Sequence, residues 1–311
     1  MDQATRTRLE LNIFPAAHQA CEPWEKFAWQ TKAHLAHSSQ AMAIDIFGTI
    51  KTSANQDAIM DALAQTLGLP TGGPWDITLE WAARSSLLNE PSPTQVDVYA
   101  ESPQSIMVFE CTLAEPDGGA CPQTMKRKGA ESCDGNYEEN GTQEQDLTGR
   151  CVLSDKGIQY WDIIPKAFHL EAEAEYQPCP FAGSSYQWMR KLVVAYKVGR
   201  QKNKQPAVVM VYADHSDLSM AQKVKSKAWT LFTETVRQEH VSLHVRSYQE
   251  ILTLAQKVTH QHSEEPPLWQ ELREWVERKI SAISSDRNSD RKKPPKKRAT
   301  SSSRMAANRN G

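Results

Sequence analysis

Two acidic residues, Asp97 and Glu110, have the surroundings best suited to chemistry in this chain. Each lies within an apolar, β-branched stretch, residues 96–99 and 106–113, and such stretches are typical of strands. Residues 102–105, Ser-Pro-Gln-Ser, predict a tight connection between them. A carboxylate in an apolar setting is unfavourable unless something pairs with it, and a divalent cation is the partner that permits catalysis. The pair therefore predicts a metal site on two adjacent antiparallel strands.

Three further side chains are candidates for the same site. Glu80 lies in a stretch, residues 75–82, that predicts the preceding strand. Gln187 and Lys191 lie one turn apart in an amphipathic stretch, residues 183–199, so a helix there would point both the same way. Simpler interpretations stay open. Glu80, or the acidic pair itself, could face solvent from a half-exposed sheet, and the helix residues could belong to an ordinary polar face.

Apolar periodicity and capping signals predict the elements that must position these residues. Helices are expected over 22–51, 55–67, 183–199, 217–237, 248–258 and 266–283. Strands are expected over 75–82, 96–99, 106–113, 207–213 and 241–245. This order predicts an α/β fold, with helices flanking one mixed sheet.

Composition and charge indicate how the chain is organised. The 311 residues carry a net charge of −2, but residues 286–311 hold nine Lys and Arg against two Asp. We expect an N-terminal extension (1–21), one domain (22–284) with a polar insertion at about 114–150, and a disordered basic tail (285–311). The insertion and the tail could contact phosphates, although a solubilising tail fits equally well. No membrane span or secretion signal is evident, which predicts a cytoplasmic protein without a membrane partner.

The acidic residues and the Gln-bearing helix occur in the order of a known family. Strand-borne Glu80 and Asp97, then Glu110-Cys-Thr112, then residues 185–191 (Ser-Tyr-Gln-Trp-Met-Arg-Lys) resemble the PD-(D/E)xK nuclease superfamily. In particular, the chain is similar to a branch of uncharacterised restriction endonucleases whose opening helix carries Ser-Ser-Gln-Ala, here residues 38–41. The resemblance covers residues 35–260. It implies the restriction-endonuclease-like fold, a mixed sheet flanked by helices, and an endonuclease that hydrolyses DNA phosphodiester bonds.

The resemblance also implies roles for single residues. Glu80, Asp97 and Glu110, with the backbone carbonyl of Cys111, would bind magnesium or manganese, and Gln187 would orient water or substrate. Oxygen ligands of this kind suit those hard cations. DNA is the expected partner, and the sequence leaves a homodimer open.

One position departs from the family pattern. The superfamily motif has Lys two residues after the second acid, where this chain has Thr112, whose hydroxyl cannot supply a positive charge. A lysine from another element could replace it, and we favour Lys191 over Lys126 or Lys128. Alternatively, the metal alone could support slow cleavage. The last alternative is a catalytically inactive protein of this fold that binds DNA or a protein partner.

The cysteines suggest a third hypothesis, a zinc-stabilised interaction protein. Six cysteines are present, and Cys121, Cys133, Cys151 and Cys179 could chelate zinc. No Cys-x-x-Cys pair occurs and the gaps are wide, so free thiols are the simpler interpretation.

Overall fold

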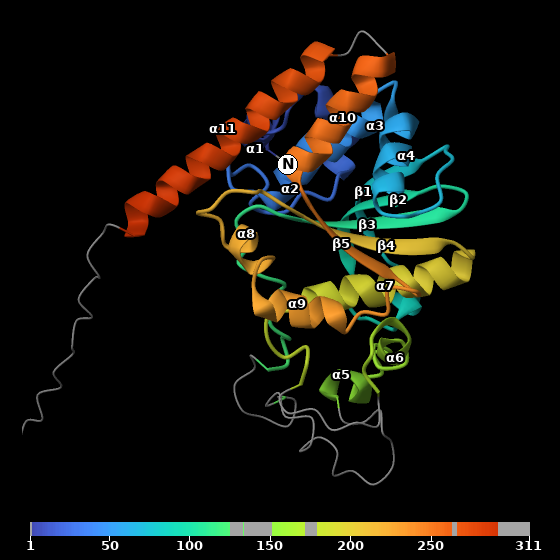
Figure 1. The fold of residues 1–311 in the computed structure, drawn as a ribbon. Helices are drawn as coiled ribbons and strands as arrows, with labels where there is room; N and C mark the ends of the chain where they lie inside the picture. Colours follow the sequence, from blue (N-terminus) through green and yellow to red (C-terminus); the bar gives the residue numbers. More distant parts are fainter. Residues whose placement is uncertain (1, 125–132, 134–150, 172–178, 263–265, 292–311) are drawn as a thin grey trace, which may run out of the picture.

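One five-stranded sheet forms the centre of the computed structural model, which describes residues 2–124, 133, 151–171, 179–262 and 266–291 (Figure 1). Its strands follow the order β1-β2-β3-β4-β5. The first three are antiparallel neighbours, whereas β3–β4 and β4–β5 are parallel. The strands are β1 (Asp76–Ala82), β2 (Gln95–Glu101), β3 (Ser105–Thr112), β4 (Gln205–Tyr212) and β5 (Ser242–Ser247). All five predicted strands, and the predicted mixed α/β fold, are therefore confirmed.

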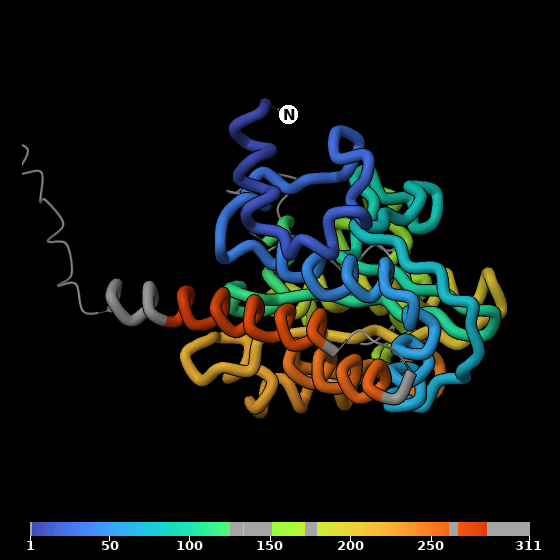
Figure 2. Tube along the Cα trace, turned by 90° about the horizontal axis from the view of Figure 1, so that it is seen from above, coloured from blue at the N-terminus to red at the C-terminus, as the bar shows by residue number. Residues whose placement is uncertain are grey.

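Helices cover both faces of this sheet, as Figure 1 shows, and Figure 2 looks down on the face covered by α10 and α11. One layer comprises α1 (Gln3–Asn12), η1 (Pro15–Cys21), α2 (Ser39–Ala43), η3 (Ile44–Gly48), α3 (Thr49–Thr52), α4 (Gln56–Thr66), α10 (Tyr248–His262) and α11 (Pro266–Arg291). The other comprises α5 (Val152–Asp155), α6 (Ile164–Ala167), α7 (Tyr186–Lys202), α8 (Ser219–Lys223) and α9 (Lys227–Glu234). Two short 3-10 helices, η2 (Trp24–Lys26) and η4 (Ser85–Leu87), complete the described elements.

Each layer has its own apolar core against the sheet. Alternate residues of β3 enter opposite cores: Phe109 packs with α2–α4 and α10, while Val108 packs with α7. This alternation follows from the two-residue period of a strand. The strand β4 is buried along almost its whole length, as expected for a central strand covered on both faces.

Two helix predictions need correction. The predicted helix over 22–51 begins only after Ser38, whose side chain accepts a hydrogen bond from Ala41 N, and residues 22–37 form the short η2 and turns. The predicted helix over 217–237 is interrupted, because Ser226 caps a second helix by accepting from Trp229 N. In both cases a serine cap, which satisfies exposed backbone N–H groups, starts a new helix inside an apolar periodic stretch.

The ends of the chain also differ in detail from the expected organisation. The stretch expected as an N-terminal extension contributes Leu9, Ile13 and Phe14 to the same core as α2–α4, so it packs with the rest of the chain. The last helix, expected to end near 283, continues to Arg291. Most of the predicted insertion and residues 292–311 of the basic tail lie outside the described residues. No helix in the part of the chain that the structure describes is both long and apolar enough to cross a membrane.

Candidate active site

The three predicted acids lie side by side on three neighbouring strands. Leu79–Val98 and Trp81–Val96 pair across β1 and β2, and this register places Glu80 opposite Asp97. Continuing the register of β2 and β3 one step beyond their last pair brings Asp97 opposite Glu110. We call this set the acidic row (Glu80, Asp97 and Glu110). It crosses the sheet near the carboxyl ends of β1 and β3.

The backbone is distorted where the acidic row crosses β1 and β2. Leu79 and Val98 pack into the core beside α2–α4, whereas Trp81 and Val96 pack into the core beside α7. Residues two apart on a regular strand would face the same side. Both strands therefore change face at the acidic row. Glu80 has a positive φ of 51°. Residues other than glycine rarely adopt this backbone conformation, and it often accompanies a functional site.

Asp97 replaces a backbone acceptor where β2 and β3 separate. Its Oδ2 accepts a hydrogen bond from Cys111 N at 2.6 Å, next to the last backbone pair. Burial raises the pKa of the Asp97 carboxyl well above its usual value, and the negative charges of Glu110 and Glu80 raise it further. A positive charge at this point would relieve that repulsion.

Glu80 is supported by Gln40 of α2 and by Gln30, which precedes that helix. It is buried, and burial raises its pKa to about 7, while the side chains of Gln40 and Gln30 oppose the shift. Gln40 in turn accepts from Gln30 N at 2.8 Å and donates to Ala28 O at 2.9 Å. The Oε1 of Glu80 is buried and has no hydrogen-bond partner among the described residues. Such an atom is costly to leave unpaired.

Lys191 supplies the ammonium group of this site. Its Nζ lies 2.9 Å from Oε2 of Glu110 and also donates to the carbonyl oxygen of Gln95. The side chain is buried on α7, which packs across β3 and β4. The parallel β3–α7–β4 connection therefore carries a lysine to the acid that the family motif would pair with Lys at the position of Thr112. Thr112 is also buried, and together with Glu110 it borders a cavity.

A cavity of about 240 Å³ opens on Asp97, Glu110 and Thr112, which we call the candidate pocket. Gln187 borders it from the first turn of α7. Its side-chain oxygen accepts from Arg190 at 3.2 Å, and Arg190 pairs with Glu90 at 3.0 Å. Of the residues predicted for the site, Asp97, Glu110, Cys111 and Gln187 border the candidate pocket, Lys191 touches Glu110, and Glu80 adjoins Asp97. Lys126 and Lys128 lie outside the described residues.

The wall of the candidate pocket next to α7 was not anticipated from the sequence. Gly118 and Gly119 accept hydrogen bonds from Gln187 N at 2.8 Å and Tyr186 N at 3.1 Å, so they satisfy N–H groups at the start of α7. Asp117 accepts from Gly119 N at 2.8 Å. The segment Pro-Asp-Gly-Gly (116–119) has the composition of a turn, which was the available signal.

Two more polar residues of the candidate pocket come from far apart in the chain. Ser39 donates to Oε2 of Glu115 at 2.5 Å, and both side chains accept from Leu113 N, at 3.0 and 3.1 Å. The Ser-Ser-Gln-Ala segment therefore ties three parts of the site together: Ser38 caps α2, Ser39 binds the end of β3, and Gln40 supports Glu80. Glu115 and Asp117 increase the negative charge around the candidate pocket.

The donors present suit a hard divalent cation. Carboxylate and carbonyl oxygens are the ligands that magnesium and manganese prefer, and Glu80 offers an unpaired buried oxygen. Among the described residues, no group of three or more His, Cys, Asp or Glu side chains is arranged to hold an ion unaided. Magnesium commonly binds through one or two carboxylates, with water and substrate phosphate completing its shell, so Asp97 and Glu110 with the Cys111 carbonyl fit it. Their role as metal ligands stays a prediction.

Comparison with known proteins identifies a family. The family model described as restriction endonuclease associating with ARP matches residues 1–277. No curated protein and no solved structure matches the chain.

Proposed function

Because the chain belongs to the family of restriction endonucleases associating with ARP, we propose that it is a metal-dependent endonuclease acting on DNA, with Lys191 in place of the motif lysine. One observation carries the proposal. The Lys191 ammonium lies 2.9 Å from Glu110, buried beside the acidic row, although the motif position holds Thr112. A nuclease-like function follows from the family, whereas metal dependence, the DNA substrate and catalytic competence are our proposal.

The lysine has the chemistry that the step needs. A bound magnesium or manganese ion would supply Lewis acidity toward water and the phosphate. Of the three N–H donors on Lys191, the described residues engage two, through Glu110 and the Gln95 carbonyl. The third can orient a water molecule or stabilise negative charge developing on the phosphate. Asp97, Glu110 and the Cys111 carbonyl would hold the cation, and Glu80 would support it from β1.

Gln187, which also borders the candidate pocket, would bind water or substrate. Its carboxamide is fixed through Arg190 and Glu90, so it can orient substrate or water with little loss of side-chain entropy. The Gly118–Gly119 backbone limits this side of the pocket.

Cleavage of several DNA forms in magnesium and in manganese tests the proposal. We expect wild-type protein to nick or cut at least one form, and Asp97→Ala to abolish that activity. Lys191→Met should reduce the rate by about 100-fold or more, as for loss of a charged group that stabilises a transition state. Lys197→Met is the matched control, because Lys197 lies on the same helix but contacts Gln159. Equal rates for Lys191→Met and wild type would overturn the role of Lys191.

A catalytically inactive DNA-binding protein is the second candidate, and Thr112 favours it. In that case the wild type cuts nothing, and Thr112→Lys gains activity by restoring an ammonium group at the motif position. The substitution points into a bordering cavity rather than into a closed core. Turnover by the wild type, abolished by Asp97→Ala, would exclude this candidate.

A further inference from the structure

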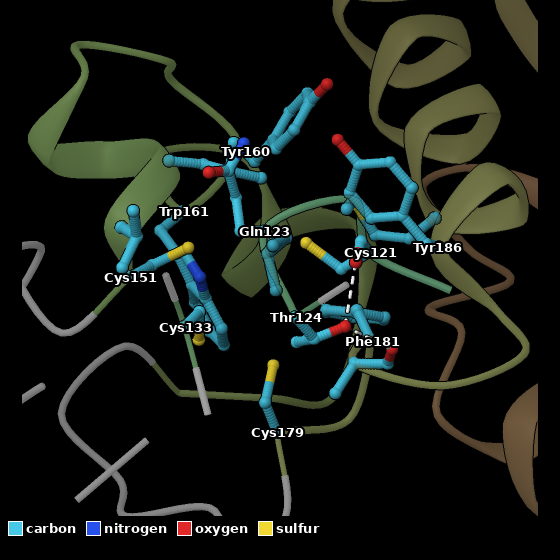
Figure 3. A pocket seen from close by; sticks show the side chains of 15 residues that line it. Cys121, Gln123, Thr124, Cys133, Cys151, Tyr160, Trp161, Cys179, Phe181 and Tyr186 are labelled. Carbon is cyan, nitrogen blue, oxygen red and sulfur yellow. Dashed lines mark hydrogen bonds between the residues drawn. The ribbon is translucent and has the colours of Figure 1, made fainter. Parts of the chain in front are cut away.

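Four of the six cysteines, which are widely spaced in the sequence, surround one small cavity. Cys121, Cys133, Cys151 and Cys179 all border a cavity of about 30 Å³ on the α7 side of the sheet (Figure 3). The sulfur atoms of these side chains lie around its interior in Figure 3. The other two cysteines, Cys21 and Cys111, belong to the opposite core. No disulfide links any of the six, all of which the structure describes.

The walls of this cavity are apolar and aromatic. Trp161, Phe181 and Met189 border it, with Tyr160 and Tyr186 beside them. Such walls exclude water. Cysteine sulfur is a soft ligand that favours metals such as zinc. Four thiolates there would be strongly unfavourable without a cation, and four thiolates around zinc form a common structural site.

A backbone turn follows three of these cysteines, whose carbonyl oxygens each accept a hydrogen bond at 3.1 Å, from the N–H groups of Thr124, Asp155 and Ala182. Burial raises the thiol pKa of Cys121 and Cys151, and the backbone N–H groups of the residues two and three positions onward oppose that rise. For Cys121 these residues are Gln123 and Thr124. Burial likewise raises the thiol pKa of Cys179, and the backbone N–H of Phe181 opposes that rise. Donors of this kind stabilise the charged thiolate and orient metal ligands.

The four cysteines border the cavity, but their side chains do not converge on a single point. Among the described residues no group of three or more candidate side chains has metal-holding geometry. In a tetrahedral site with Zn–S bonds of about 2.3 Å, the sulfurs stand about 3.8 Å apart. The cavity has room for more than one water-sized sphere, and so for an ion between the sulfurs.

We propose that Cys121, Cys133, Cys151 and Cys179 bind one structural zinc ion. The ion joins four segments that are otherwise connected by long stretches of chain. Cys121 follows the Gly118–Gly119 wall of the candidate pocket by two residues, and its N–H donates to Ala182 O at 3.1 Å. The zinc site therefore anchors that wall and the start of α7. It is separate from the acidic row, whose oxygen ligands suit a different class of metal.

Metal content of the purified full-length chain tests the proposal directly. We expect one zinc per chain by elemental analysis, and one cobalt after exchange, with the intense thiolate charge-transfer bands of a four-sulfur site. Cys179→Ser should lose the ion or weaken its binding by at least 100-fold. Cys21→Ala is the matched control, since Cys21 is buried in the opposite core and should leave the zinc content unchanged. Asp97→Ala should also retain zinc, which separates this site from the proposed nuclease site.

If a serine variant does not fold, thiol reactivity and Tm of the wild-type protein test the proposal. With zinc bound, four thiols should resist a thiol reagent in the folded protein and react when a strong chelator removes the metal, and Tm should fall at the same time. Protein that holds neither zinc nor cobalt under reducing conditions, with all four thiols present, would overturn the proposal. A disulfide between any two of these cysteines in freshly purified protein would overturn it equally.

Discussion

Glu80 links the charge of the acidic row to the stability of the fold. Its pKa is about 7 in the folded chain because of burial, against an ordinary value of 4.5. Between these values the folded state binds more protons than the unfolded state, so stability falls as pH rises. The loss by pH 8 amounts to up to about 3 kcal/mol for a shift of this size.

We therefore expect Glu80→Gln to stabilise the metal-free protein at pH 8 and to change little at pH 4.5. Urea denaturation at both values measures the difference, with the exposed Glu277→Gln as the control. Magnesium should raise the Tm of the wild type more at pH 8 than at pH 6, because metal binding needs the ionised carboxylates. Destabilisation by Glu80→Gln of the same size at both pH values would contradict the argument.

A substitution at Gly118 tests how tightly the wall of the candidate pocket is packed. A Cβ added there would lie 2.6 Å from Cδ2 of Trp188 and 2.9 Å from the carbonyl oxygen of Ser184. Since both are fixed by packing or by the hydrogen bond from Gly118 N, Gly118→Ala should lower the free energy of unfolding by about 1–3 kcal/mol. Gly183→Ala is the matched control, because a Cβ there meets nothing within 4 Å. Chemical denaturation of both variants checks this, and equal midpoints would contradict it.

At the scale of elements, one buried ion pair adds to the apolar packing that attaches α11. Lys279 lies 2.6 Å from Oδ2 of Asp45 and donates to Asn12 O at 2.5 Å. Asp45 also accepts from Phe14 N at 2.7 Å and Trp275 Nε1 at 3.0 Å. The pair therefore joins α11, the N-terminal segment and η3 at one point inside the core.

Lys279→Met should lower the free energy of unfolding by about 3–5 kcal/mol, since it leaves Asp45 buried without its cation. Burial already raises the pKa of Asp45, and removing Lys279 raises it further. The loss should therefore grow as pH rises above the raised folded-state pKa of Asp45 in the wild type, because above it the wild type ionises Asp45 beside its cation and the variant cannot. Denaturation at pH 5 and 8 measures it, and Glu277→Ala, an exposed change on the same helix, is the control. Adding Asp45→Asn to Lys279→Met should recover part of the loss at pH 8, and no recovery would contradict the ionic origin.

Strands and their acids were predictable because local patterns determine them. Acids inside apolar stretches indicated β2 and β3, and the four-residue spacing from Gln187 indicated Lys191. Residues 22–37 were predicted wrongly as helix because long-range bonds decide their path, such as those of Gln40 to Gln30 N and Ala28 O. The sequence named the four cysteines of the zinc candidate, but their wide spacing favoured free thiols, because only the packing of the second core brings them to one cavity.

At the scale of the whole molecule, charge is distributed unevenly along the sequence of a protein whose candidate pocket is bordered by acids. The last 26 residues carry nine Lys and Arg against two Asp, while the protein as a whole has a net charge of −2. An acidic body repels the DNA backbone, so a nuclease of this charge needs basic side chains that can reach phosphates. The basic tail supplies the largest such group in the sequence.

Replacing the seven Lys and Arg of residues 292–311 by Ser and Gln keeps the chain length and removes this charge. If the tail contacts DNA, affinity should fall and the dependence of log K on log salt should become shallower, by about 0.9 for each lost phosphate contact. Binding of a catalytically inactive Asp97→Ala chain to short duplexes between about 50 and 200 mM salt measures both quantities, the range over which such contacts dominate. Unchanged affinity and slope, with an unchanged Tm, would show that the tail only solubilises the protein and that phosphate contacts come from the folded body.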